Sequence, residues 1–309
     1  SLTSEGLKFE FLGADATEEE WLARVRPETR AVYTESVPNP KNDVVDLELL
    51  GRVAARAGVP LIVDNTVATP YLCRPIEWGA DIVIHSTSKW LSGHGSVIGG
   101  VIIDAGKFDW AANSERFPHF TKGSFEGAPS FIERYGADTF MSYVKSVTVL
   151  DYGPTVPPTS TFLLLHGIET LSLRMERHVE NAQRVAEWLE ARPEVASVDY
   201  SGLPSNAYYE LAQKYLPDGA GSVVSFNIQK KQNTTRKFVE ALELVSHMTH
   251  IGDVRTLALH MESTIFKRST QEQRDEAGVT PGLIRLSIGI EGIDDILADL
   301  EQSLQAAKG

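Results

Sequence analysis

Two short runs of apolar, mostly β-branched residues constrain the fold of this chain more than any other feature of its sequence. The first spans residues 61–63 and is followed by Asp64. The second spans residues 82–84 and is followed by polar residues, among them Ser86, Ser88 and Lys89. Such runs are typical of strands that are buried on both faces of a parallel sheet. Because ligands of open α/β sheets bind beyond the carboxyl ends of the strands, these polar residues are candidate site residues.

The side chains at the two strand ends suit one kind of cofactor chemistry. A lysine amine can form a Schiff base with an aldehyde, and an aspartate beside a pyridine nitrogen keeps that nitrogen protonated, so that the ring withdraws electrons. Serine hydroxyls such as those of Ser86 and Ser88 can donate hydrogen bonds to a phosphate. Pyridoxal 5'-phosphate needs all three functions. From the spacing alone, a solvated serine–lysine loop after an ordinary strand remains an equal alternative.

The patterns in the first half of the chain predict an α/β domain. In chain order we expect a strand at 7–12, a helix at 17–26, a strand at 30–35, an amphipathic helix at 46–57 and, after Lys89, a buried strand at 97–103. Alternation of strands and helices predicts a parallel sheet with right-handed crossovers. Residues 104–158 are rich in Phe, Gly, Pro and charged residues, and we expect loops and short helices there.

A proline-rich stretch that ends at Pro158 marks the expected domain boundary. Residues 1–158 are expected to form a large domain, and residues 159–309 a smaller α+β domain. Apolar residues at helical spacing over 162–189 would open the second domain. The other elements expected there are strands at 195–200, 222–228 and 283–288 and helices at about 206–215, 233–243 and 293–306.

The chain resembles the Cys/Met-metabolism family of pyridoxal-phosphate enzymes, and most closely its members that act on O-acetylhomoserine. The likeness covers most of residues 28–305, and its densest matches are residues 59–66, 79–83, 85–89, 93–95, 169–175 and 283–291. The resemblance implies the aspartate-aminotransferase-like fold. In that fold a large domain holds a mostly parallel sheet, and a smaller α+β domain follows it.

The resemblance also implies a role for each matched residue. Lys89 would be the catalytic lysine that joins the cofactor aldehyde, with Asp64 beside the ring nitrogen. Asn39 would contact the cofactor's phenolic oxygen or the substrate carboxylate, although an asparagine between two prolines is by itself typical of a turn. Arg285 corresponds to the substrate-carboxylate ligand, since a guanidinium binds a carboxylate bidentately; the alternation of its strand alone would favour an exposed arginine. Ser263 matches a serine that orients the bound substrate and the lysine.

The reaction implied by the resemblance is a γ-substitution. Acetate would leave O-acetyl-L-homoserine, and sulfide or a thiol would replace it to give homocysteine or methionine, while Lys89 moves protons between substrate carbons. The chain departs from the family pattern at residues 125–127, 157–161 and 260–266, near the expected entrance for the second substrate. A carbon or amine nucleophile, as in specialised metabolism, is therefore an alternative.

Members of the family carry a further N-terminal stretch that grips the phosphate and stacks an aromatic ring on the cofactor. We therefore expect the large domain of this chain to lack its N-terminal part. A non-catalytic, truncated family member that serves as an oligomer partner is an alternative of another class. A cofactor-free Schiff-base aldolase is less favoured, because Asp64 and the serines would then have no task. The resemblance further implies a homo-oligomer, a dimer of dimers, that shares active sites between subunits.

Composition disfavours several other classes of protein. The formal net charge of −13 disfavours binding to nucleic acid or to an anionic membrane. No apolar run has the length of a membrane span, and the beginning of the chain does not read as a signal peptide. The single cysteine, Cys73, has apolar neighbours and is expected to be buried and inert. We expect a cytoplasmic enzyme of small molecules and, for lack of a cluster with metal-ligand spacing, no metal site.

Overall fold

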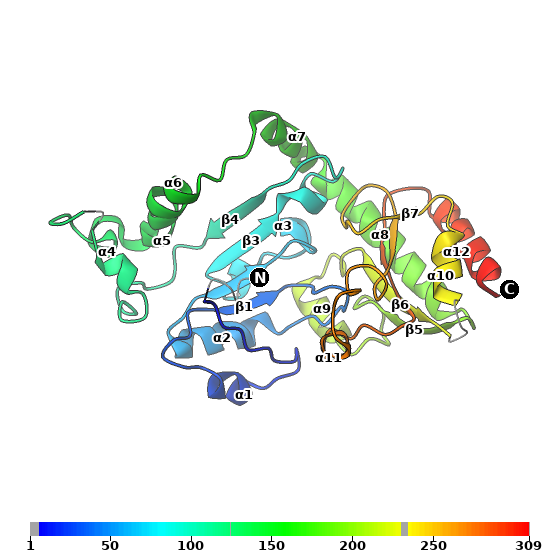
Figure 1. Ribbon diagram of the computed structural model, residues 1–309, viewed down its shortest axis with the longest axis horizontal. Coiled ribbons are helices and arrows are strands. Elements are labelled where there is room, and N and C mark those ends of the chain that lie inside the picture. The colour runs from blue at the N-terminus through cyan, green and yellow to red at the C-terminus, as the bar shows by residue number, and fades with distance from the viewer. Residues whose placement is uncertain (1–5, 124, 230–233, 309) are drawn as a thin grey trace.

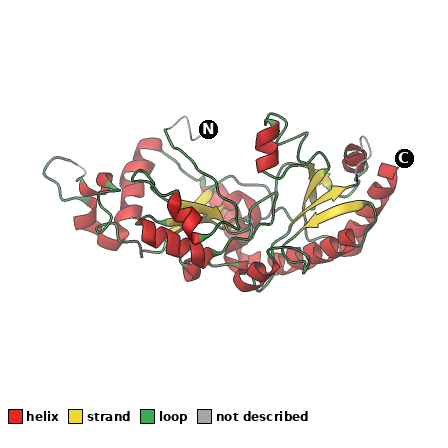
Figure 2. Cartoon of the chain, turned by 90° about the horizontal axis from the view of Figure 1, so that it is seen from below, coloured by secondary structure: helices red, strands yellow, loops and turns green. Residues whose placement is uncertain are grey.

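The computed structural model describes residues 6–123, 125–229 and 234–308 (Figure 1). Two sheets organise this part of the chain. A four-stranded sheet has the order β1-β2-β3-β4, and a five-stranded sheet has the order β5-β6-β9-β8-β7. The two sheets lie apart from each other with helices packed around them (Figure 2).

The first sheet contains the two apolar runs as neighbouring parallel strands. Its strands are β1 (Val32–Glu35), β2 (Leu61–Asp64), β3 (Ile82–Ser86) and β4 (Gly100–Asp104). The first three are parallel, and β4 is antiparallel to β3. In the register of β1 and β2, Glu35 lies beside Asp64. The expectation of a mostly parallel sheet is thus confirmed, and the carboxyl ends of three strands meet at one edge.

Two helices precede β2. They are α1 (Glu18–Ala23), within the range expected for it, and α2 (Leu47–Ala57). The Asp46 side chain caps the first turn of α2, and Gly58 ends the helix in the left-handed conformation that glycine adopts most easily. The apolar stripe of α2, which includes Leu50 and Val53, is buried as expected.

Two expectations for this part of the chain are wrong. Residues 7–12 form no strand, because they pair with no neighbouring strand and leave apolar side chains exposed, Phe11 by 90%. The strand expected at 97–103 begins only at Gly100, and it is not buried. It pairs with β3 alone among the described strands, so that Val101 and Ile102 are 39% and 43% exposed.

Residues 104–158 form loops and short helices, as expected. The helices are η4 (Pro118–Thr121), α4 (Phe131–Tyr135), η5 (Gly136–Asp138), α5 (Thr139–Tyr143), η6 (Val144–Thr148) and α6 (Val149–Tyr152). The segment extends away from both sheets (Figure 1). It is held together by its own small aromatic core, with Trp110, Phe117 and Phe120 at its centre.

The long helical pattern over 162–189 forms two helices rather than one. They are α7 (Pro158–Glu169) and α8 (Leu171–Glu190), and the break between them is at Thr170. The apolar side chains of α7 are largely exposed, Phe162 by 60% and Leu165 by 56%. Most of those of α8 are buried, because this helix packs between α3 (Thr69–Leu72), the second sheet and α12 (Ile293–Lys308).

The second sheet is mostly antiparallel. Its strands are β5 (Val195–Asp199), β6 (Val223–Ile228), β7 (Ser246–His247), β8 (Leu257–His260) and β9 (Leu283–Ser287), and only β7 and β8 run parallel. The helices of this part are α9 (Tyr209–Tyr215), α10 (Thr234–Glu240), α11 (Gln271–Glu276) and α12 (Ile293–Lys308). Strand β9 is central, and all five of its residues are buried. The expectation that Arg285 is exposed, drawn from strand alternation alone, is therefore wrong.

One hydrophobic cluster connects the two sheets. It extends from residues of β1 and β2, such as Val63, through α8 to Phe226 of β6 and Leu300 of α12. The boundary expected at residue 158 coincides with the first residue of α7. The division into residues 1–158 and 159–309 remains our proposal.

Candidate active site

Lys89 lies in a short, irregular helical segment directly after β3. This segment, η3 (Thr87–Leu91), has π-helical hydrogen bonds, and the backbone of Lys89 itself is not helical. Trp90 is fully buried, and its indole Nε1 donates to the Ser222 hydroxyl over 3.0 Å. The buried Arg174 guanidinium donates to the carbonyl oxygen of Trp90 over 2.8 Å and to that of Gly167 over 2.6 Å. The segment that carries Lys89 is therefore fixed to the second half of the chain.

A cavity of about 180 Å³ opens beside Lys89, at the carboxyl ends of β1, β2 and β3. The helical turn α3 (Thr69–Leu72) follows β2, and η2 (Pro75–Trp78) precedes β3. The residues that line the cavity are Glu35, Val37, Asn39, Asp64, Thr66, Val67, Ser86, Lys89 and Ile251. Four of the residues singled out in the sequence thus meet at one place: Asn39, Asp64, Ser86 and Lys89.

Thr66 links the ends of β2 and β3. Its backbone N–H and its hydroxyl both donate to Asp64 Oδ1, over 3.0 and 2.5 Å. The same hydroxyl accepts a hydrogen bond of 2.8 Å from the backbone N–H of Ser86. The Asp64 carboxylate is thereby held at the cavity wall by neutral donors.

The cavity places two carboxyl groups close together. Burial, and next the neighbouring charge of Asp64, raise the pKa of Glu35 to about 7. Burial also lowers the pKa of the Lys89 amine, and the nearby positive charge of Arg285 adds to this effect. A larger share of Lys89 is therefore neutral, the form in which an amine attacks an aldehyde or accepts a proton.

Arg285 is a buried cation, only 4% exposed. Its Nη1 donates to Asn39 Oδ1 over 3.0 Å, and its Nη2 donates to the backbone carbonyls of Thr249 and His250 over 2.8 and 3.3 Å. Its Nε has no hydrogen-bond partner in the described part of the chain, and no described carboxylate forms an ion pair with it. Burial lowers its pKa to about 10. A buried guanidinium of this kind is stabilised by an anionic ligand.

Three of the expected site residues do not line the cavity: Arg285, which reaches it only through Asn39, and the serines Ser88 and Ser263. The Ser88 hydroxyl accepts a hydrogen bond from the backbone N–H of Gly99 over 3.1 Å, which joins η3 to the segment before β4. Ser263 is exposed, and its hydroxyl bonds with His260 Nδ1 over 2.8 Å. The hydrogen bonds that these serines make explain their positions without a ligand.

Sequence reasoning missed two residues of the site. Thr66 follows Asp64 by two positions, and a hydroxyl so close to a strand-end carboxylate is a usable signal. His250 bonds with Lys89 from 161 positions away, its Nδ1 lying 3.1 Å from Lys89 Nζ. No local pattern around His250 indicates this contact, since it depends on the packing of the two sheets.

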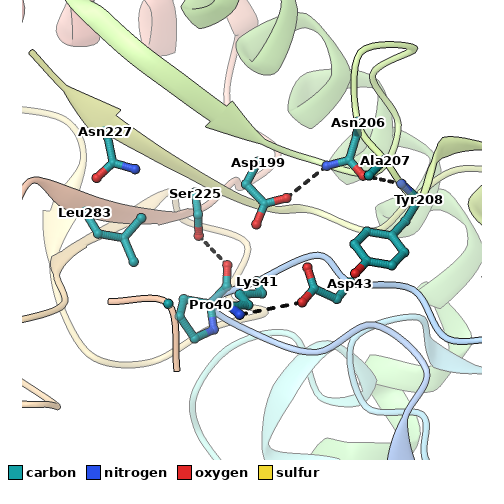
Figure 3. Close-up of a pocket in the computed structure, with 11 residues that line it drawn as sticks. Pro40, Lys41, Asp43, Asp199, Asn206, Ala207, Tyr208, Ser225, Asn227 and Leu283 are labelled. Carbon is teal, nitrogen blue, oxygen red and sulfur yellow. Dashed lines mark hydrogen bonds and ion pairs between the residues drawn. The ribbon is translucent and has the colours of Figure 1, made fainter. Parts of the chain in front are cut away.

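A second cavity, of about 260 Å³, is lined by Pro40, the residue after Asn39 of the first cavity (Figure 3). Its lining includes Pro40, Lys41 and Asp43 on one side and Asp199 and Ser225 on the other. Neither Asp64 nor Lys89 is among its lining residues. The larger cavity is therefore not the one that the sequence predicts.

The polar groups of the smaller cavity fit pyridoxal phosphate. They comprise the amine of Lys89, whose pKa is lowered, the carboxyl group of Asp64 and the hydroxyl of Ser86. The buried guanidinium of Arg285, with its unpartnered Nε, adds a receptor for a carboxylate. These groups define the class of the protein, a pyridoxal-phosphate enzyme that acts on a carboxylate-bearing substrate.

Comparison with known proteins gives the same class. The model of the Cys/Met metabolism PLP-dependent enzyme family matches residues 1–305, and the chain belongs to this family. Its cofactor is accordingly pyridoxal phosphate. Cys73 is buried, as expected, and burial raises the pKa of its thiol to about 12. No described helix is long and apolar enough to cross a membrane, and the described residues include no group of three His, Cys, Asp or Glu placed to hold a metal.

Individual relatives narrow the comparison. The chain is 47% identical to a homocysteine synthase of Schizosaccharomyces pombe over 92% of its length, which is 67% of that relative. It is 43% identical to an O-acetyl-L-homoserine sulfhydrylase of Leptospira meyeri over 90% of its length and 64% of the relative.

A solved structure is similar to this chain in fold. It is described as an O-acetylhomoserine (thiol)-lyase of Campylobacter jejuni and carries an N'-pyridoxyl-lysine-5'-monophosphate. It superposes with a TM-score of 0.93 at 32% identity, over 98% of this chain and 72% of that one. The expected fold class is thereby confirmed.

Proposed function

We propose that the protein catalyses γ-substitution on O-acetyl-L-homoserine, in which sulfide or a thiol replaces acetate to give homocysteine or methionine. The observation that carries the proposal is that Lys89 and Asn39 line one cavity and that the buried Arg285 donates a hydrogen bond to this Asn39. Lys89 would transfer protons, and the Asn39–Arg285 pair would bind a carboxylate. An amino-acid substrate requires both functions. The names of the relatives, homocysteine synthase and O-acetyl-L-homoserine sulfhydrylase, support the choice of substrate.

The residues of the cavity divide the work between them. The cofactor, when bound, withdraws electrons from the substrate's α-carbon. Asp64 would hold the proton on the ring nitrogen, and Ser86 would bind the phosphate. Arg285 and Asn39 would fix the substrate carboxylate, which supplies the anion that the guanidinium lacks. Lys89 Nζ would then take the α-proton and, in a later step, a β-proton as acetate leaves the γ-carbon, and it would return protons to these carbons after the nucleophile has added.

The alternative of a larger, non-sulfide nucleophile gains no support from the geometry. It was suggested by unusual residues at 125–127, 157–161 and 260–266, and none of these lines the cavity that contains Lys89. Phe125 is 73% exposed and Ile265 48% exposed. We therefore retain sulfide or a small thiol as the nucleophile.

We further propose a homo-oligomer, a dimer of dimers, located in the cytoplasm, with active sites shared between subunits. The exposed apolar side chains of α7 and β4 support a surface that is covered in an assembly. Sedimentation of the purified protein, with and without pyridoxal phosphate, tests the assembly. A monomer under both conditions would contradict it.

The activity is tested by supplying the protein with pyridoxal phosphate, O-acetyl-L-homoserine and one acceptor at a time. We expect homocysteine from sulfide and methionine from methanethiol, each at a higher rate than any product of larger carbon or amine acceptors. Faster reaction with a larger acceptor would favour the alternative nucleophile. Protein that neither turns yellow with the cofactor nor forms any product would favour the non-catalytic oligomer partner.

A further inference from the structure

His250 contacts the amine on which the chemistry depends. Its ring Nδ1 lies 3.1 Å from Lys89 Nζ, within hydrogen-bonding distance. Lys89 is not ion-paired to any described carboxylate, so His250 is the side chain that meets its free amine. Burial, and next the charge of Lys89, lower the pKa of His250, which keeps the imidazole neutral. A neutral ring can accept a hydrogen bond at Nδ1 only if its proton is on Nε2.

The backbone around His250 is fixed on two sides. Its carbonyl and that of Thr249 accept hydrogen bonds from Arg285. The backbone N–H of Gly252 donates to the Ser287 hydroxyl over 2.9 Å. Gly252 also packs so closely on Trp90 that a Cβ there would come within 2.6 Å of the indole ring. The imidazole is therefore presented to Lys89 by a rigid segment.

The far side of the His250 ring faces Gly95, in the loop between η3 and β4. A Cβ at Gly95 would lie 3.7 Å from His250 Nε2 and 3.1 Å from the Asp253 carboxylate. The Nε2 atom is buried and has no hydrogen-bond partner among the described residues. The ring is thus enclosed, and Lys89 is the one described side chain to which it is hydrogen-bonded.

We propose that His250 is a positioning residue for Lys89 that accepts a hydrogen bond from Nζ whenever the amine is free of the cofactor. The inference rests on the proposed function and deepens it. When Lys89 takes a proton from the α-carbon it becomes an ammonium ion with three N–H groups, one of which His250 holds. Over a full turnover the protons return to the substrate carbons, and Lys89 ends as the neutral amine with no net change of charge.

A purely structural role makes different predictions. If the ring only fills space, leucine should replace it well and asparagine poorly, because leucine has a similar volume and no acceptor. If Nδ1 acts as an acceptor, His250→Asn should keep the function, because its amide oxygen can accept from Lys89, and His250→Leu should lose it.

The test is the pH dependence of Lys89 acylation in the cofactor-free protein, measured peptide by peptide with mass spectrometry. Arg285 acts on both Lys89 and His250, and Asp253 and Arg255 act on His250. Glu35 and Asp64 line the cavity with Lys89, and all five of these residues stay unchanged. Loss of the acceptor disfavours the ammonium form. In His250→Leu we expect the labelling midpoint of Lys89 to fall by about one pH unit, with His250→Asn close to the parent protein.

The comparison of His250→Leu with His250→Asn decides between the two roles. An unchanged Lys89 midpoint in His250→Leu, or an equal shift in both variants, would overturn the proposal. If His250→Leu does not fold, His250→Ala carries the same comparison, since it also lacks the acceptor. Labelling needs neither cofactor nor substrate, so a parent protein without γ-substitution activity would count against the proposed function and not against this contact. In the active protein we expect kcat to fall about tenfold in His250→Leu with little change in KM.

Discussion

The two cavities beside the Asn39–Pro40 turn contain similar residues and differ in their charge balance. Each has a lysine and two carboxyl groups in its lining. In the larger cavity, Lys41 is 42% exposed and pairs with Asp43 over 3.8 Å. In the smaller cavity, Lys89 has no carboxylate partner among the described residues, and the buried Arg285 lies close enough to lower its pKa.

The carboxylates of the larger cavity are also satisfied internally. Asp199 accepts a hydrogen bond of 2.9 Å from the Asn206 side chain (Figure 3). It accepts another, of 3.2 Å, from the Asn42 backbone N–H. Behind Asn39 of the smaller cavity, in contrast, lies the buried cation Arg285, which has no ion-pair partner among the described residues. The smaller cavity therefore needs a ligand to balance its charges, and the larger cavity does not. Unbalanced buried charge, rather than residue type or cavity size, therefore distinguishes the site.

The largest difference between the cavities should appear at their aspartates. Asp64→Asn removes the charge that would hold the proton on the cofactor's ring nitrogen, so we expect kcat to fall about a hundred- to a thousandfold. Asp43→Asn, in the larger cavity, should leave kcat within about twofold. Steady-state kinetics with O-acetyl-L-homoserine and sulfide measures both. Similar losses in the two variants would remove the distinction.

Arg285 should give the next largest effect. Arg285→Lys keeps a positive charge but loses the planar fork that binds a carboxylate, so we expect KM for the amino-acid substrate to rise about ten- to a hundredfold. Arg255→Lys is the control, because this exposed arginine is already paired with Asp253. A normal KM in Arg285→Lys would show that the substrate carboxylate binds elsewhere.

Glu35 should make the stability of the cofactor-free protein depend on pH. Its pKa in the folded protein is about 7, above its ordinary value of 4.5, so the folded state holds a proton that the unfolded state releases. Stability should therefore fall as pH rises from about 4.5 to 7, with the whole cost present above pH 7.

The neutral variant Glu35→Gln should remove that cost. We expect it to be more stable than the parent protein at pH 8 by about 1–3 kcal/mol, and no more stable at pH 4.5, in urea unfolding. Glu28→Gln, at an exposed position before β1, is the control and should change stability by less than about 0.5 kcal/mol at both pH values. Equal stability of Glu35→Gln and the parent protein at pH 8 would contradict the raised pKa of Glu35, which burial and the charge of Asp64 cause.

The smallest predicted effect concerns the wall between the cavities. The buried Ser225 hydroxyl donates to the Pro40 carbonyl over 2.5 Å, and Ser225 lies beside Arg285 in the register of β6 and β9. Ser225→Ala should cost about 1 kcal/mol of stability and raise KM severalfold, because Asn39 is held less firmly. Ser263→Ala, whose serine is exposed, should change neither by a measurable amount. The reverse order of effects would restore Ser263 to the site.

The strands and helices with strong local signals were predictable from the sequence. Helix α2 has a cap, an apolar stripe and a terminal glycine, and β2 and β3 end in the polar residues that mark the site. The segment at 7–12 has an equally apolar alternation, yet it forms no strand. Alternation reports only which residues could face a core, and a strand also needs a neighbour to pair with.

The parts of the site that depend on distant contacts were not predictable in the same way. The burial of Arg285 follows from the central place of β9, and its bond to Asn39 joins residues 246 positions apart. The contact between His250 and Lys89 is of the same kind. Resemblance to a family identified Arg285 and not His250, since only the packing of the two sheets brings that ring to the amine.

The central claim is that Lys89, and not Lys41, forms the bond to the cofactor. The most direct test is to add pyridoxal phosphate to the protein, reduce with borohydride and locate the pyridoxyl group by peptide mass spectrometry. We predict a single modified peptide that contains Lys89, with no modification and no visible absorbance in Lys89→Ala. A pyridoxyl group on Lys41 or another lysine, or an unchanged absorbance in Lys89→Ala, would contradict this account of the site.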